Sequence, residues 1–305
     1  MRTFLIQAAS FIMLLVSGSL AGQQDSSQID KRVLQDTTKS LLWEVSGNGI
    51  SEVSWVYGTI HMIGEEDFFL TPSTLESFDS SKQVTFEINM DDMFSISTLL
   101  SMMSNAVMDD GLTLKDLLTK EEYQLVKAHF EELGMPLFLF EKVKPLFLSS
   151  LASGNEGGLQ GEGIKSYEME FMQRARKNKQ KMDGLETVDF QMSLFDSISY
   201  KDQAQMLVES IRSENDGNGE FEKMVDLYKS QDIHAMYNLF ESEEDMSELE
   251  DVLLIMRNKN WIPIMEKMMA EKPTFFAVGA GHLGGPYGVL NLLYQQGYTI
   301  KPILD

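Results

Sequence analysis

Two histidines stand in the same sequence context near opposite ends of this 305-residue chain. In each case an apolar, strand-like run reaches a glycine and the histidine follows three residues later, in VYGTIH for His61 and AVGAGH for His282. A glycine at a strand end permits a turn that a side chain would block, so the next residues are presented at the rim of a sheet. Ligands of sheet-based enzymes collect at that rim. The repeated pattern predicts two imidazole ligands that folding brings together.

Two carboxylates end strand-like segments of their own and can join these histidines. The segment 84–88 reads as a strand that places Glu87 among apolar neighbours, and the segment 181–187 reads as a brief strand that ends in Glu186. With the histidines, Glu87 makes a two-histidine, one-carboxylate set suited to zinc, manganese, cobalt or iron. Glu186 is a candidate second ligand or general base toward a metal-bound water, whose pKa the cation lowers. The alternative is that both histidines are ordinary hydrogen-bonded loop residues.

The second histidine lies inside a literal GxGxxG at Gly279, Gly281 and Gly284, which is also the pattern of a dinucleotide-binding turn. Such a turn needs further strands and an acidic residue roughly 20 residues on to bind the ribose. Asp305 has that spacing, but it is the last residue of the sequence and leaves no chain for the remaining strands. We therefore favour the interpretation in which the histidine, and not the glycine turn, is the functional feature.

The composition excludes several classes of catalytic or metal-binding chemistry and several classes of partner. The chain has no cysteine, which excludes disulfides, thiolate nucleophiles and cysteine-based zinc sites. Its formal net charge is −22, and such a surface repels nucleic acid and anionic membranes. We therefore expect neither as a partner. The 21 methionines fall mostly on helical segments, where we interpret them as flexible core residues and not as a binding groove.

The N-terminus has the features of an export signal. A basic start at Arg2 is followed by an apolar run at 4–16 and by small residues at Ser19 and Ala21. This pattern predicts a signal peptide over residues 1–21, cleaved after Ala21, and a periplasmic or secreted protein with no stable membrane anchor. Residues 22–40 are polar and predict a flexible segment. Residues 41–305 are then expected to form one domain.

The pattern of elements indicates strands and helices in one domain, with a helical insert in the middle of the chain. Two β-rich runs at 41–45 and 53–57 flank a Gly-Asn-Gly turn, which predicts a hairpin. A helix that starts at Pro72 and a strand at 84–88 follow. The middle of the chain is helical, and a strand at 274–278, a helix at 286–296 and a strand at 298–304 complete the pattern. His129 and His234 lie in polar helical segments and are expected to be solvated.

Taken together, short sequence blocks over residues 41–305 resemble the TraB/GumN family, which includes plasmid pheromone-shutdown proteins and is related to the animal Tiki membrane proteases. In chain order the blocks are Trp43-Glu44-Val45, Tyr57-Gly58-Thr59-Ile60-His61, Phe86-Glu87, Gly184-Leu185-Glu186-Thr187 with Gln191, Arg257-Asn258, Val278-Gly279-Ala280-Gly281-His282-Leu283 and Gly297-Tyr298. The family's middle segment usually carries a Gly-Tyr-Gly-Leu-Asp-like stretch. This chain departs from that pattern with Ser166-Tyr167-Glu168-Met169-Glu170, where Glu170 is the candidate replacement for the aspartate.

The resemblance implies an α/β fold of the mixed α+β kind, in which a central mixed sheet from a duplicated core is flanked by helices and has a helical middle insert. It also implies a metal-dependent hydrolytic centre that contains His61, His282 and Glu87, and less directly Glu186 and Arg257. Arg257 then holds a substrate carboxylate or a developing oxyanion, unless it is an ordinary arginine on a helix surface. The leading hypothesis is an exported peptidase-like hydrolase that uses a divalent metal (manganese, cobalt or zinc) on a peptide or small-protein substrate. The alternatives are a peptide-binding or sequestering protein of the same fold without turnover, and an envelope protein whose histidines only support the fold.

Overall fold

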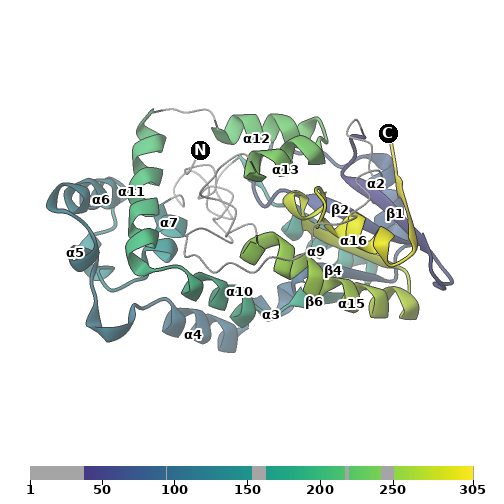
Figure 1. Cartoon of the computed structure of the whole chain (residues 1–305), viewed down its shortest axis with the longest axis horizontal. Coiled ribbons are helices and arrows are strands. Elements are labelled where there is room, and N and C mark those ends of the chain that lie inside the picture. Colours follow the sequence, from purple (N-terminus) through teal and green to yellow (C-terminus); the bar gives the residue numbers. More distant parts are fainter. Residues whose placement is uncertain (1–37, 94, 153–162, 217–219, 242–250, 305) are drawn as a thin grey trace, which may run out of the picture.

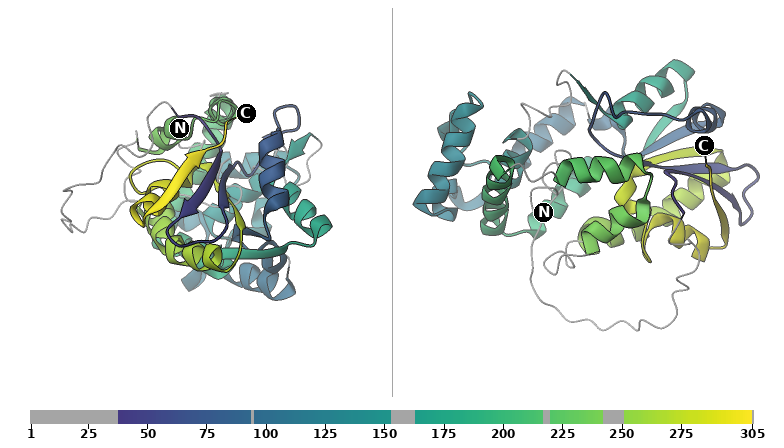
Figure 2. Two further views of the ribbon diagram at one scale, coloured as in Figure 1. Left: turned by 90° about the vertical axis from the view of Figure 1, so that its right-hand side faces the viewer. Right: turned by 90° about the horizontal axis from the view of Figure 1, so that it is seen from above.

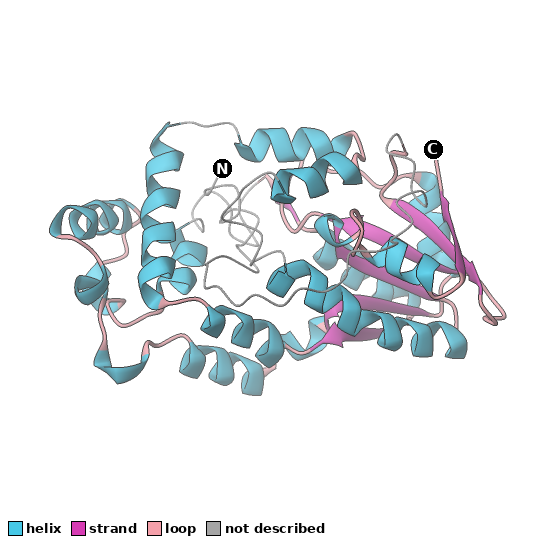
Figure 3. Ribbon diagram, in the orientation of Figure 1, coloured by secondary structure: helices cyan, strands magenta, loops and turns pink. Residues whose placement is uncertain are grey.

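The computed structural model describes residues 38–93, 95–152, 163–216, 220–241 and 251–304. Helices surround one six-stranded sheet, so the expected mixed α/β class is confirmed (Figures 1 and 3). The N-terminal segments expected to be a signal peptide and a flexible lead-in lie almost entirely outside the described residues. Within the described ranges, no helix has the length and apolar character needed to cross a membrane.

The sheet has the strand order β6-β4-β7-β2-β1-β8. The strands are β1 (Leu42–Gly47), β2 (Ser54–Thr59), β4 (Gln83–Ile88), β6 (Lys181–Glu186), β7 (Thr274–Gly279) and β8 (Tyr298–Pro302). The strands β6, β4, β7 and β2 run parallel to one another, whereas β1 is antiparallel to both β2 and β8. A second, two-stranded sheet pairs β3 (Ile63–Gly64) with β5 (Ile164–Lys165). The sheet is therefore mixed, and its four parallel strands can gather side chains at one edge.

The expected hairpin is present as β1 and β2, which pair from Leu42 opposite Tyr57 to Val45 opposite Ser54. Gly47 and Gly49 in its turn have φ values of 82° and 84°, a region that glycine reaches without strain. Every residue of β2 is buried, as is usual for a strand covered on both faces. The hairpin therefore fixes β2 in the interior of the sheet beside β7.

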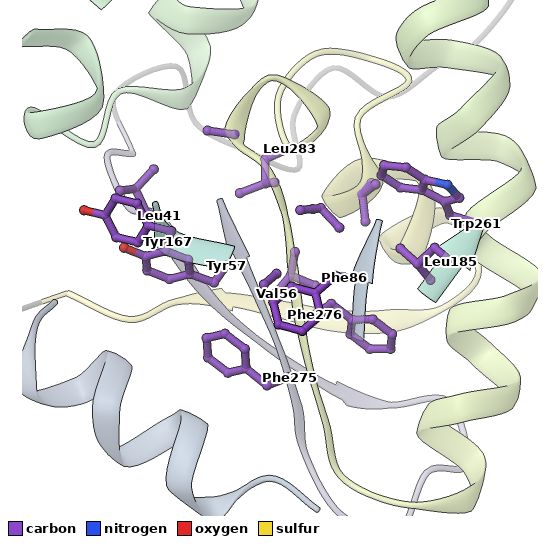
Figure 4. Packing of buried hydrophobic residues seen from close by; sticks show 14 of the residues in the cluster. Leu41, Val56, Tyr57, Phe86, Tyr167, Leu185, Trp261, Phe275, Phe276 and Leu283 are labelled. Carbon is purple, nitrogen blue, oxygen red and sulfur yellow. The ribbon is translucent and has the colours of Figure 1, made fainter. Parts of the chain in front are cut away.

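Helices cover both faces of the parallel strands. On one face α2 (Pro72–Ser80) and α9 (Tyr167–Asn178) pack through Phe78 and Phe171, whose rings lie 5.1 and 5.2 Å from the ring of Phe275. Figure 4 shows Phe275 among the buried side chains of this core, together with Tyr57 of β2 and Tyr167 of α9. On the other face lies α15 (Met256–Glu271), where Met268 accepts a hydrogen bond from Thr85 of β4. Because side chains alternate along a strand, Glu87 points to the same face as Thr85 and hence toward α15.

The caps of several helices agree with the sequence. Thr71 caps α2, whose first residue is Pro72, and Thr119 forms a capping box with Glu122 at the start of α6 (Lys120–Glu132). Pro145 begins α7 (Pro145–Ala152), because proline lacks an amide hydrogen and fits the first turn.

The helical middle of the chain forms a second core beside the sheet domain (Figures 1 and 2). It consists of α5 (Leu114–Leu117), α6, α7 and α11 (Tyr200–Asp216). Phe130, Leu148 and Leu207 are fully buried within it. The helices α12 (Glu220–Lys229) and α13 (Ile233–Glu241) lead from α11 back to the sheet, where the Tyr228 hydroxyl donates to the Gly58 carbonyl at 2.9 Å.

Two strand glycines allow close approach at the edge where the candidate site lies. A Cβ on Gly184 of β6 would lie 2.4 Å from the Asn89 nitrogen, and a Cβ on Gly58 of β2 would lie 3.0 Å from the Ala280 Cβ. We expect Gly184→Ala to lower the free energy of unfolding by about 1 to 3 kcal/mol, because β6 must move away from β4. Gly58→Ala should cost less, because its nearest contact is longer. Urea unfolding of both variants tests this order, and a Gly184→Ala protein as stable as wild type would contradict it.

Candidate functional site

Four parallel strands end side by side, and each leads to one of the predicted side chains. Glu186 ends β6 and lies opposite Ile88, so it is next to Glu87 near the end of the neighbouring β4. Thr59 of β2 lies opposite Gly279 of β7, and His61 and His282 follow two and three residues later. His282 belongs to a single 3₁₀ turn, η6 (Ala280–His282). The topology therefore places the four side chains along one edge in the order Glu186, Glu87, His282, His61.

Arg257 of α15 joins this edge from the covering helix, and it is only 2% exposed. One of its terminal nitrogens donates to Glu87 at 2.5 Å and to Glu186 at 2.5 Å, and its Nε donates to Glu186 at 2.9 Å. The other terminal nitrogen lies 3.0 Å from the Leu253 carbonyl and 3.1 Å from His282 Nε2. All five N–H groups of the guanidinium thus have acceptors. Arg257 is not the helix-surface arginine that the sequence left as one alternative.

Glu87 is held ionised in the interior. Burial alone would raise its pKa, but the charge of Arg257, with a smaller contribution from protonated His61, outweighs burial and holds the pKa well below its usual range. The Gly279 amide adds to this effect by donating to Glu87 Oε1 at 2.8 Å. In a dinucleotide turn the same amide would face a pyrophosphate, so its use by a carboxylate is further support for setting that interpretation aside.

His282 is neutral, with its protonation pattern fixed by its neighbours. Burial and then the charge of Arg257 lower its pKa to about 3. Because Arg257 can only donate, Nε2 of the imidazole is an acceptor, and Nδ1–H donates to the Asn258 Oδ1 at 2.7 Å. The ring of Trp261 lies 4.4 Å from the imidazole. The lone pair of His282 is therefore on Nε2, which lies 3.8 Å from Glu87 Oε1.

His61 has the opposite protonation state because it has a carboxylate partner. Its Nδ1 lies 2.9 Å from Glu168 Oε1, which also accepts from Thr59 at 2.7 Å. Burial would lower the pKa of His61, but the charge and hydrogen bond of Glu168 outweigh burial and raise it to about 9. A carboxylate on Nδ1 is the usual outer partner of a metal-binding histidine, since it fixes the ring with Nε2 toward the metal.

The His61–Glu168 pair predicts a pH dependence of stability in metal-free protein. The folded pKa of about 9 lies above the unfolded value near 6.5, so stabilisation by the protonated ring is complete below about pH 6.5 and is lost as pH rises through 9. We expect Glu168→Gln to be less stable than wild type near pH 6, and the difference to narrow toward pH 9. Urea unfolding at both pH values, with chelator present, measures this. An equal deficit at pH 6 and pH 9 would contradict it.

The donor atoms fit a divalent cation in their chemistry, although the ligands are not assembled around one. Among the described residues, no group of three or more histidine, aspartate or glutamate side chains is arranged to hold a metal ion. Glu87 and the neutral Nε2 of His282 suit a cation, and their 3.8 Å separation is compatible with bonds of about 2 Å to the same ion. A cation would have to compete with Arg257 for both groups and displace the proton from His61.

One important residue was missed by the sequence reasoning, which took Glu170 as the candidate carboxylate in the middle segment. Glu168, two positions earlier on α9, is the residue that reaches His61. A signal was available, because Phe171, Met172 and Ala175 are apolar at three, four and seven residues after Glu168 and mark the buried face of the helix. The same positions after Glu170 are polar or basic, which marks the solvent face.

The other two histidines are less exposed than the sequence predicted. His129 on α6 and His234 on α13 are half-buried and not solvated, and the Nε2 atom of each is buried. The reason is that the polar segments around them pack one side against neighbouring helices, a pattern that composition alone does not reveal. Neither residue lies at the parallel strand ends that carry the site.

A model of the TraB/PrgY/gumN family matches residues 41–302 of this sequence. The chain belongs to the TraB/PrgY/gumN family. The match covers all the strands of the sheet and every residue of the site described above. The suspected family, and its relation to Tiki proteins, are therefore confirmed.

Searches of curated proteins find distant relatives named as metalloproteases. Metalloprotease TIKI2 of Danio rerio is 21% identical over 332 residues, which cover 91% of this chain and 64% of that protein. Metalloprotease TIKI1 of Homo sapiens is 22% identical over 354 residues, which cover 98% of this chain and 68% of that protein. The chain thus spans about two thirds of the length of these relatives. No solved structure matches the chain.

Proposed function

We propose that this protein is an exported, metal-dependent hydrolase of the peptidase type. The observation that carries the proposal is the meeting of His61, His282 and two carboxylates at adjacent parallel strand ends, with Nδ1 of both histidines engaged by partner groups. The family membership and the relatives named as metalloproteases support it. We infer a peptide or small-protein substrate from those names. Export to the periplasm or the medium rests on the sequence of residues 1–21.

In this proposal His61, His282 and Glu87 hold the divalent cation, which when bound lowers the pKa of a water molecule. The partners of the ligands support these roles: Asn258 and Glu168 each fix one imidazole, and the Gly279 amide orients Glu87. Such outer contacts orient ligands and tune their basicity. Zinc, manganese and cobalt all accept this combination of nitrogen and oxygen donors.

Glu186 is the proposed proton acceptor. Its Oε1 is occupied by Arg257 and by Gln191, at 2.9 and 2.5 Å, and its Oε2 takes one described hydrogen bond, from Trp261 at 3.0 Å. A carboxylate oxygen can accept a second hydrogen bond, so Oε2 keeps the capacity to receive a proton. Proton transfer by a side chain placed in this way typically contributes 10²- to 10⁴-fold to a rate.

We assign Arg257 a positioning role and not a substrate contact. Its five N–H groups are occupied by Glu87, Glu186, His282 and a backbone carbonyl, so it has no N–H group for a substrate carboxylate or oxyanion unless a cation displaces it from Glu87 or His282. It neutralises two buried carboxylates that would otherwise repel each other. The same complete pairing favours a second candidate function, a peptide-binding protein of this fold that performs no turnover.

A peptide-library digest separates the two functions. We expect the purified, untagged protein to cleave peptides after it is loaded with manganese, cobalt or zinc. Cleavage should stop when chelator is added and resume when the metal is restored. Glu186→Gln should retain the metal and lose about 10²-fold or more in rate. Peptide binding without cleavage under every metal condition would favour the non-catalytic alternative and overturn the proposal.

A further inference from the structure

Helix α4 (Ile96–Asn105) has its apolar side facing outward. Ile96, Leu99, Leu100 and Met103 have exposed fractions of 48 to 77%, and their spacing of three, four and seven residues places them on one face. No residue of α4 is buried. Surface helices of a folded protein normally turn such a face toward the core. This apolar face of α4 therefore needs an explanation other than the stability of the chain.

Of the three half-buried side chains of α4, two are polar. Thr98, Ser101 and Met102 are half-buried, and the Ser101 hydroxyl donates to Asp189 of α10 (Val188–Leu194) at 2.8 Å. The Ser95 hydroxyl caps the start of the helix. The helix is joined to α10 in part through the Ser101–Asp189 hydrogen bond, and its four most exposed apolar residues face outward. Figure 1 shows α4 and α10 beside each other, next to the ends of β4 and β6.

The charges around this face are acidic. No lysine or arginine occurs between Lys82 and Lys115, whereas Asp91 and Asp92 precede α4 and Asp109 and Asp110 follow it. All four aspartates are exposed. The neighbouring segment 182–200, which includes α10, has no basic residue either. Two basic side chains do reach this side from elsewhere, because Arg176 pairs with Asp91 at 2.7 Å and Lys144 pairs with Asp196 at 2.6 Å.

We propose that the apolar face of α4 binds a basic amphipathic helix of a polypeptide partner. The aliphatic stripe matches the apolar side of such a helix, and the aspartates at both ends of α4 match its lysines or arginines. The same charges disfavour the other occupants: a second copy with a net charge of −22 and an anionic membrane would both be repelled. This inference does not depend on the proposed hydrolytic function.

Fluorescence anisotropy with a labelled model peptide tests the proposal. The probe is a lysine/leucine peptide of about 18 residues that forms an amphipathic helix, and its control has the same composition in a scrambled order without an apolar face. We expect saturable binding of the probe to the full chain, weakening as salt rises, and little binding of the scrambled peptide.

Matched variants locate the binding. Leu100→Gln and Met103→Gln leave the net charge unchanged and, at exposed fractions of 62 and 71%, should not disturb folding. We expect each to weaken probe binding about tenfold or more. Leu304→Gln is the control, because Leu304 is 69% exposed and follows β8 at the other edge of the sheet. A double variant, Asp92→Asn with Asp110→Asn, should weaken binding and reduce its salt dependence.

Several results would overturn the proposal. These are equal affinity of wild type and the α4 variants for the probe, equal binding of the scrambled peptide, and no probe binding at all. Sedimentation that shows a dimer dissociated by Leu100→Gln would assign the face to a second copy. Flotation of wild type, but not of Leu100→Gln, with zwitterionic vesicles, together with no preference for the helical peptide, would assign it to lipid.

Discussion

Replacing Arg257 with leucine will lower the free energy of unfolding by about 3 to 5 kcal/mol. The guanidinium is only 2% exposed and is the counter-ion of both Glu87 and Glu186. Its removal leaves two carboxylates close together in the interior with one positive partner fewer, and a buried charge without a partner is far more costly than a lost surface pair. Chemical denaturation at neutral pH measures the change.

The matched control is Arg176→Leu. Arg176 also pairs with an aspartate, at 2.7 Å, but both side chains are more than half exposed. Exposed pairs contribute about 0 to 1 kcal/mol, so this variant should stay near wild type. Adding Glu87→Gln to Arg257→Leu should restore part of the lost stability, because one of the unpaired charges is then gone. If Arg257→Leu lowered the free energy of unfolding no more than Arg176→Leu, then Arg257 would not be the counter-ion that makes burial of Glu87 and Glu186 tolerable.

His282→Ala is expected to have the second large effect, this time on metal binding and turnover. Removing a contact to a metal ligand typically costs 10- to 100-fold in affinity, and removing the ligand itself should cost at least the upper end of that range. Chelator-sensitive peptide cleavage should fall in parallel, because the proposed water activation depends on the bound cation. Isothermal titration with manganese, cobalt and zinc gives the affinities, and a peptide digest gives the rates.

His129→Ala is the control for this experiment, since His129 lies on α6 in the second core and away from the strand ends. It should leave metal affinity and cleavage at wild-type values. Circular dichroism of both variants checks that the fold is retained. Equal metal affinity in His282→Ala and wild type would show that any cation the protein binds is held elsewhere.

The sequence predicted the positions of the strand ends well, because the signals that mark them are short and lie close together along the chain. Each relevant strand is a short apolar run followed by a glycine or a carboxylate, and these signals lie within a few residues of one another. The hairpin turn, Glu87 at the end of β4 and Glu186 at the end of β6 were all expected and are all present. Both histidines follow strand ends as expected. They lie at the same edge of the sheet because β2 and β7 are parallel neighbours.

The pairing of the side chains could not be predicted, because it depends on how each helix is rotated. Glu168 and Glu170 are two residues apart, which places them on nearly opposite sides of α9. The apolar residues at 171, 172 and 175 mark the side of Glu168 as the buried one, but they do not reveal that His61 is the residue it meets. Arg257 shows the same limit: its sequence neighbours do not reveal that α15 turns it inward toward Glu87 and Glu186. The outward apolar face of α4 was likewise invisible, since its spacing is that of an ordinary core helix.

The central claim is that His61, His282 and Glu87 hold one divalent cation. Anomalous diffraction from crystals of the protein soaked in manganese, cobalt or zinc, recorded at the absorption edge of each metal, tests it most directly. We predict a single strong peak within about 2.0 to 2.3 Å of Nε2 of both histidines and of a Glu87 oxygen, with Arg257 moved off at least one of its present partners. A peak that lacks either histidine, or no peak while Arg257 keeps all its present contacts, would contradict the account.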